Sequence, residues 1–217
     1  MNAIAQIRQH VGGEVFDYQV LLDALAGYRK PRDKITRLLA SGAIVRVKKG
    51  LYCFGEAFRK EPLSREYLGN LIYGPSYVSL DYALSHYGLI PERVEIVTSV
   101  TTGRSRDFDT PFGVFSYRML KSPRYAAGAM IERAGNTSFL VASPEKALAD
   151  KVWTDKRFSG LRLSDYDAYL ADDLRIDRQS LSGFDDFRLQ VIAAAYDSAK
   201  INNLVQYLNR LKEAPHA

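Results

Sequence analysis

The chain has 217 residues, of which 47% are hydrophobic and 12% aromatic, so it can build an ordinary core and is not a largely disordered chain. No apolar run approaches 18 residues and the N-terminus lacks an apolar signal-peptide core, so we expect neither a transmembrane helix nor a secretory signal. The single cysteine, Cys53, and three dispersed histidines exclude an internal disulfide and give no metal-ligand spacing, which predicts a cytoplasmic protein without metal or cofactor.

The net charge of +5 is concentrated in one segment. Residues 29–60 hold ten basic side chains against two acidic ones, a net charge of +8, whereas the rest of the chain carries −3. Such a local excess is typical of a surface that contacts nucleic acid.

The first 43 residues predict three short helices. Ile4, Ile7 and Val11 recur at helical spacing, and Asp17 can cap a second helix. Pro31 suits the first turn of a third helix, where its missing N–H has no partner to lose, and Gly42 is a suitable stop.

A β-hairpin is predicted over Ile44–Phe54, "IVRVKKGLYCF", because two β-forming runs flank Lys48-Lys49-Gly50. Three short helices followed by a hairpin is the order of a winged helix-turn-helix. In that fold the third helix enters the DNA major groove and the hairpin forms the wing.

The charges of the third helix and the hairpin fit this interpretation. Asp33, Thr36 and Arg37 point away from the apolar stripe of the helix at 100° per residue, and the hairpin tip would place lysines beside phosphate. The alternative is that these charges are only solvated. The predicted DNA-contacting residues are Arg29, Lys30, Arg32, Asp33, Lys34, Thr36, Arg37, Arg46, Lys48 and Lys49.

A polar stretch ending in Pro62 predicts a domain boundary, with a DNA-binding domain at 1–60 and a larger mixed α/β domain at 61–217, an α+β chain overall. In the second domain, helices are predicted over 63–73, 79–87, 144–153, 165–170, 189–200 and 201–212, and strands over 94–101, 113–120 and 137–143.

One short motif in this second part has a catalytic counterpart. Ser143-Pro-Glu-Lys146 matches S-x-x-K, but the partner motifs of that enzyme class are absent. Ser143 as a helix N-cap followed by Pro144 explains the residues without chemistry. We therefore expect no catalytic residues and a protein that is not an enzyme.

The polar segment Thr101–Thr110 is predicted to be a loop between two strands. It could grip phosphate or be a solvated turn, and the residues leave both open. A possible second basic site, provided that its members share one face, consists of Arg104, Arg106, Arg118, Lys121 and Arg124.

The segment Ser164–Phe187 is acidic, with seven aspartates against Arg175 and Arg178. Such a segment can serve a metal or a basic partner, although a solvated face is the commoner reason for it.

Four stretches in this order resemble a known family: "IVRVKKGLYCF", "PSYVSLDYALSHYGLIPE", "VTSVTTGRSRDFDTPFGVFSYRML" and "ASPEKALADKVW". Over roughly residues 30–155 the chain resembles the AbiEi-type antitoxins, transcriptional regulators of bacterial abortive-infection toxin–antitoxin systems.

The resemblance implies an N-terminal winged helix that represses its own operon at operator repeats of double-stranded DNA. It also implies a C-terminal domain that opposes a nucleotidyltransferase-like toxin, with or without direct contact. By position, residues 32–37 would read DNA and residues 46–49 would form the wing, and no catalytic residue carries over.

Two other functions stay open at this point. The larger domain could be an enzyme acting on nucleic acid or nucleotides, delivered to its substrate by the winged helix. It could also be a non-catalytic adaptor that docks a protein partner. Stand-alone relatives without a toxin are a further case.

Overall fold

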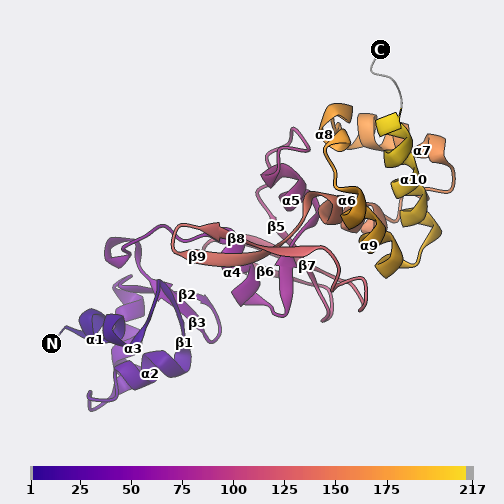
Figure 1. Cartoon of the computed structure of the whole chain (residues 1–217). Coiled ribbons are helices and arrows are strands. Elements are labelled where there is room, and N and C mark those ends of the chain that lie inside the picture. Colours follow the sequence, from indigo (N-terminus) through magenta and orange to yellow (C-terminus); the bar gives the residue numbers. More distant parts are fainter. Residues whose placement is uncertain (1, 214–217) are drawn as a thin grey trace.

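The computed structural model describes residues 2–213, and within them the protein is a mixed α+β structure with ten α-helices and two β-sheets. This confirms the predicted α+β class. The molecule is elongated, with the N-terminal helices at one end, the larger sheet in the middle and the C-terminal helices at the other end (Figure 1). No helix of this part of the chain is both long enough and apolar enough to cross a membrane.

The N-terminal unit contains the three predicted helices and the predicted hairpin. Asn2 and Asp17 cap the first two helices with their side chains, and Pro31 opens the third. A short strand that sequence reasoning missed completes a sheet of order β1-β3-β2, because three residues are too few to show alternation. The elements are α1 (Ala3–His10), β1 (Val15–Asp17), α2 (Tyr18–Ala24), α3 (Pro31–Ala40), β2 (Ile44–Lys48) and β3 (Leu51–Phe54).

This small sheet lies between two hydrophobic cores. One face carries Ile44, Tyr52 and Phe54, which pack with the helices α1–α3. The other face carries Leu51 and Cys53, which belong to the core of the C-terminal part. All four residues of β3 are therefore buried, and the hairpin joins the two halves of the molecule.

The C-terminal part is built on a six-stranded mixed sheet of order β6-β7-β5-β4-β9-β8. Its helices pack against the sheet and against one another in a single core. The elements up to the last strand are a 3-10 turn (Glu56–Phe58), α4 (Arg65–Ile72), β4 (Ser76–Val78), α5 (Leu80–His86), β5 (Val97–Thr101), β6 (Arg106–Thr110), β7 (Gly113–Met119), β8 (Ala129–Ala134) and β9 (Thr137–Ala142).

Helices follow the last strand and form the far end of the molecule (Figure 1). They are α6 (Pro144–Thr154), α7 (Leu163–Ala168), a π-helical segment (Tyr169–Asp173), α8 (Arg178–Ser182), α9 (Asp186–Tyr196) and α10 (Ala199–Glu213). The prediction missed β4, β8 and α8. It was also wrong to treat Thr101–Thr110 as loop throughout, because Arg106–Thr110 forms β6 and pairs with β7.

The centre of the sheet is completed by a side chain. Strands β4 and β9 pair through one residue pair only, Val78 and Val141. Beside it, the Asn70 amide accepts a hydrogen bond from the Leu140 N–H at 2.6 Å and donates one to the Leu140 carbonyl at 3.2 Å. Asn70 thus satisfies the backbone groups that a strand partner would otherwise pair.

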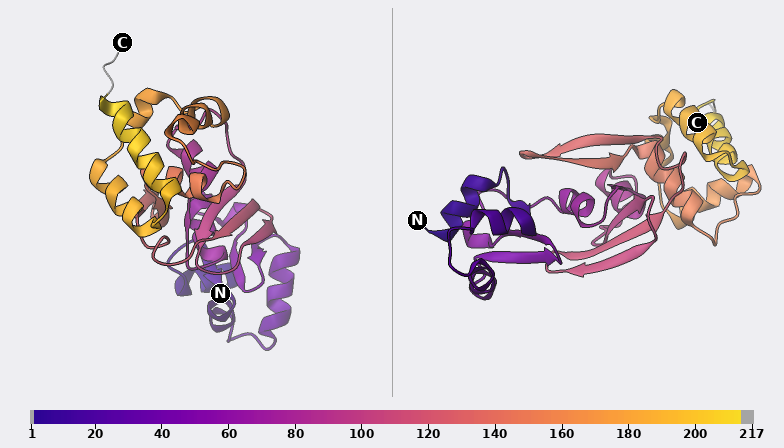
Figure 2. Two further views of the ribbon diagram at one scale, coloured as in Figure 1. Left: turned by 90° about the vertical axis from the view of Figure 1, so that its right-hand side faces the viewer. Right: turned by 90° about the horizontal axis from the view of Figure 1, so that it is seen from below.

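Two β-ribbons reach from the middle of the molecule toward the N-terminal half (Figure 2). The turn of the β8–β9 ribbon contacts the connecting segment, where the Asn136 amide donates to Glu61. The β6–β7 ribbon meets the hairpin tip, where the Lys48 ammonium lies 6.0 Å from the centre of the Phe108 ring. The two halves are therefore in contact at several points besides the covalent connection.

We predict that Gly55→Ala destabilises the fold by more than about 1 kcal/mol. A β-carbon at Gly55 would clash with the backbone carbonyl of Gly42, which cannot move aside like a flexible side chain. Gly27→Ala is the matched control, because no atom lies within 4 Å of a β-carbon there. Urea unfolding of both variants measures the difference, and equal stabilities would contradict the prediction.

Candidate nucleic-acid interface

The exposed face of α3 and the segment before it form a basic surface, which we call the α3 surface. It surrounds a shallow hollow of about 410 Å³. Its lining residues are Tyr28, Arg29, Lys30, Asp33, Lys34 and Arg37. Sequence reasoning expected all of these except Tyr28 to contact DNA, and the structure brings them together.

Few contacts within the protein hold these side chains. The Lys34 ammonium lies 5.2 Å from the centre of the Tyr28 ring, and Lys30 and Asp33 form a long, exposed ion pair at 3.9 Å. Exposed pairs of this kind contribute about 0–1 kcal/mol. Within residues 2–213 no ion pair or side-chain hydrogen bond engages the Arg37 guanidinium, and Arg32 at the start of the helix is also exposed.

Thr36 is exposed on the same face, and its hydroxyl donates to the Arg32 carbonyl at 3.1 Å. The buried face of the helix carries Ile35 and Leu38, as the spacing predicts. The helix therefore presents Asp33, Thr36 and Arg37 outward from a fixed backbone.

The hairpin tip differs from the expectation at Lys48. Its ammonium donates to the carbonyl of Ile72, the last residue of α4, instead of standing beside Lys49 at an open tip. A cation at a helix C-terminus satisfies a carbonyl that has no partner within the helix. Burial, and then the nearby charge of Arg106, lower the pKa of Lys48.

The reason is the packing of the hairpin on the C-terminal core. Its four-residue run, Leu51-Tyr-Cys-Phe54, is apolar at every position, which is a pattern of strands buried on both faces. That signal could have shown that the hairpin does not project freely. Arg46 and Lys49 remain exposed.

The possible second basic site is only partly assembled. Arg104, Arg106 and Lys121 are exposed, and Arg118 forms an ion pair with Asp107 at 3.5 Å. The expectation was wrong for Arg124. Its Nε donates to the Tyr196 carbonyl at 2.7 Å, and its guanidinium lies 4.1 Å from the centre of the Trp153 ring.

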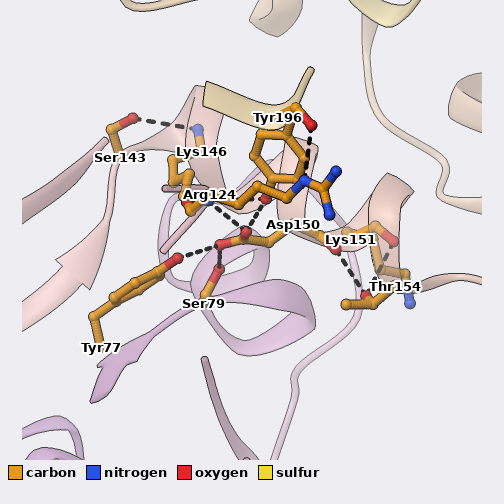
Figure 3. A network of polar contacts seen from close by, with 9 residues as sticks. All are labelled: Tyr77, Ser79, Arg124, Ser143, Lys146, Asp150, Lys151, Thr154 and Tyr196. Carbon is orange, nitrogen blue, oxygen red and sulfur yellow. Dashed lines mark hydrogen bonds and ion pairs between the residues drawn. The ribbon is translucent and has the colours of Figure 1, made fainter. Parts of the chain in front are cut away.

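A buried polar network lies where the sequence suggested only a capped helix (Figure 3). Lys146 and Asp150 on α6 form an ion pair at 2.7 Å, and both side chains are fully buried. The Lys146 ammonium also donates to the Tyr196 hydroxyl at 2.9 Å and to the Arg124 carbonyl at 2.8 Å, so its three donors all have acceptors.

Three hydroxyl groups complete the network on the side of Asp150. One carboxylate oxygen accepts from the Tyr196 hydroxyl, and the other accepts from Tyr77 at 3.1 Å and from Ser79 at 2.7 Å. Burial and the charge of Asp150 raise the pKa of both tyrosines. Burial also lowers the pKa of Lys146, although Asp150 opposes that shift.

The Ser143-x-x-Lys146 motif therefore has a structural role. The Ser143 hydroxyl accepts from the Lys146 backbone N–H at 3.3 Å, which confirms the predicted cap. The Lys146 ammonium is bonded to Asp150, Tyr196 and the Arg124 carbonyl instead of to that hydroxyl.

The acidic segment is largely occupied by local roles. Asp177 and Asp185 cap α8 and α9. Asp167 accepts from Arg178 at 2.6 Å and from the Tyr207 hydroxyl at 2.7 Å. Within residues 2–213 no group of three or more His, Cys, Asp or Glu side chains is arranged to hold a metal ion.

Comparison with known proteins adds no identification. No protein-family model matches the chain, and a search of curated proteins found no match. The α3 surface and the resemblance described above are therefore the features that bear on function.

We predict that Lys146→Met lowers the free energy of unfolding by about 3–5 kcal/mol, because it leaves Asp150 as an unpaired buried charge. Lys151→Met on the same helix is the matched control. Lys151 pairs with Asp81 near the surface, where losing the pair costs about 1 kcal/mol or less. Chemical denaturation measures the free energy of unfolding of both variants. Equal losses would show that the buried pair contributes no more to stability than the surface pair.

Proposed function

We propose that the chain is a sequence-specific DNA-binding repressor whose residues 1–60 form a winged helix-turn-helix. The observation that carries the proposal is the α3 surface, a basic helix face that the rest of the protein leaves uncovered. An exposed helix of this kind fits the width of the DNA major groove.

The topology of the N-terminal unit supports the proposal. The elements follow in the order α1, β1, α2, α3, β2 and β3, and β1 and β2 both pair with β3. In this arrangement α3 takes the place of the recognition helix, and the short connection after α2 brings Arg29 and Lys30 beside it.

The basic residues take different roles in this proposal. Arg37 and Asp33 lie one helical turn apart, where they can contact base edges, because Arg pairs with guanine and Asp accepts from cytosine. Arg29, Lys30, Arg32 and Lys34 meet phosphate, which positions the protein without reading sequence. Lys49 and Arg46 extend this contact, whereas Lys48 is removed from it by its bond to Ile72.

We predict that Arg37→Ala weakens binding to the operator by about 1–3 kcal/mol and weakens binding to random DNA much less, because a base contact is lost. Titration of the promoter fragment upstream of the gene, and of a random duplex, measures both at matched salt. Arg157→Ala is the control, since its side chain is 92% exposed in the C-terminal half.

Salt dependence tests the phosphate contacts separately. Lys49→Ala should reduce the slope of log K against log salt by about one unit, and Lys48→Ala should not reduce it. Absence of duplex binding at low salt would contradict the proposal. If Lys48→Ala reduces the slope as much as Lys49→Ala does, Lys48 contacts DNA phosphate after all.

The resemblance to AbiEi-type antitoxins extends the proposal to a role in toxin–antitoxin control in the cytoplasm. The nucleic-acid-processing alternative stays a hypothesis beside it. No contact of the chain with a toxin is part of the proposal.

If a nucleotidyltransferase-like toxin gene lies beside the gene of this chain, we predict that the full chain restores growth of cells that express that toxin. When both genes have foreign promoters, the operator no longer controls expression of the toxin, so loss of DNA binding cannot change the amount of toxin. Arg37→Ala should then restore growth as well as the wild type does. Colony counts measure the rescue. If Arg37→Ala fails to rescue while the wild type succeeds, neutralisation depends on DNA binding and the two roles are not separable.

A further inference from the structure

A cleft in the C-terminal half, which we call the α5–α6 cleft, lies between α5, α6 and the π-helical segment. Its volume is about 560 Å³, within the range of small-molecule sites. Part of its wall is apolar and is formed by Ile90, Val94 and Leu174. Neither the α3 surface nor the buried network of Lys146 and Asp150 uses this space, so the cleft is available for another role.

Carboxylates outnumber cations in the α5–α6 cleft. The charged side chains of its wall are four carboxylates and two cations, namely Asp81, Glu92, Asp155 and Asp173 with Lys151 and Arg157. Three of the carboxylates already form ion pairs, which are Asp81–Lys151 at 2.6 Å, Asp155–Arg157 at 3.5 Å and Glu92–Arg175. Within residues 2–213 no ion pair or side-chain hydrogen bond engages the fourth carboxylate, Asp173. The cleft therefore keeps one carboxylate free for a cation.

The ends of two helices add to the negative potential of the cleft. Asp155 is the C-cap of α6, and Asp173 is the last residue of the helical run that begins with α7. Both residues belong to the wall of the cleft. Because a helix carries a partial negative charge at its C-terminal end, both ends favour a bound cation.

Tyr169 shows where these charges converge. The side chain is buried, and its ring stacks on Phe158 with the ring centres 3.9 Å apart. Burial raises the pKa of its hydroxyl, and the charges of three carboxylates, Asp155, Asp81 and Asp173, raise it further. Tyr169 also begins the π-helical segment, a rare backbone form that is frequent at functional sites. A titratable group with a shifted pKa in a cleft is a further mark of such a site.

We infer that the α5–α6 cleft binds a small organic cation, an aliphatic amine or a guanidinium compound. Its charged group pairs with Asp173, and the apolar wall covers its carbon chain. A metal ion is a poorer fit, because within residues 2–213 no group of three or more His, Cys, Asp or Glu side chains is arranged to hold one. An anion would meet an excess of carboxylates and the negative ends of two helices.

Isothermal titration calorimetry of the full chain with putrescine, spermidine and agmatine tests the inference. Butanediol is the matched control, because it has the carbon chain of putrescine without the charge, and succinate tests the opposite charge. We expect one-to-one binding of at least one of the three cations, with a Kd of about 1 mM or tighter, and no binding of butanediol or succinate. Failure of all three cations to bind, or binding of succinate in their place, would overturn the inference. All titrations are made without DNA, so the inference and the proposed function can fail separately.

A charge variant locates the site. Asp173→Asn keeps the size of the side chain and removes its charge, so it should raise the Kd about fivefold or more. Asp172→Asn is the matched control, because Asp172 is the adjacent exposed carboxylate and is not part of the wall of the cleft. Equal effects of the two variants would show a diffuse attraction to acidic surface and would overturn the location.

A space-filling variant tests the cleft without changing any charge. Val94→Trp fills the space beside the apolar wall and should abolish binding, whereas Ile96→Trp should not, because Ile96 is 45% exposed outside the cleft. Circular dichroism confirms the folding of each variant. A folded Val94→Trp protein that binds the cation like the wild type would overturn the inference. If Val94→Trp does not fold, Asp173→Asn still decides the location, because it removes no ion pair within the protein.

Discussion

The buried pair of Lys146 and Asp150 is the interaction on which the C-terminal half depends. Lys146 donates a hydrogen bond to Tyr196 at the end of α9. Asp150 accepts hydrogen bonds from Tyr77 on strand β4 and from Ser79 at the start of α5. Leu80, directly after Ser79, has a φ of 60°, a conformation that costs free energy in a leucine and needs its neighbours fixed. Because a buried charge without its partner is so costly, these elements can hardly separate from α6 one at a time. The network therefore sets where α9 stands and which of its faces remains outside.

A second constraint joins the two halves through the hairpin. The small sheet contributes side chains to both cores. Lys48 adds a hydrogen bond from the hairpin to the carbonyl at the end of α4. A hairpin fixed in this way cannot swing independently, so the orientation of α3 is coupled to the C-terminal half. In the proposed function, a partner that displaces the β6–β7 ribbon would also disturb the hairpin.

Local sequence signals predicted the elements that depend on local causes. The caps at Asp17 and Ser143 and the proline at the start of α3 act on their own helix, so the sequence carries the full signal. The direction of Lys48, the inward turn of Arg124 and the burial of Lys146 depend on residues far away in the chain. A lysine four residues before an aspartate on a helix is usually a surface pair. Only the fold, which brings Tyr77 and Tyr196 together around this pair, makes it a buried one. Strands β4 and β8 were missed for a similar reason, since the strands that they pair with define them more than their own composition does.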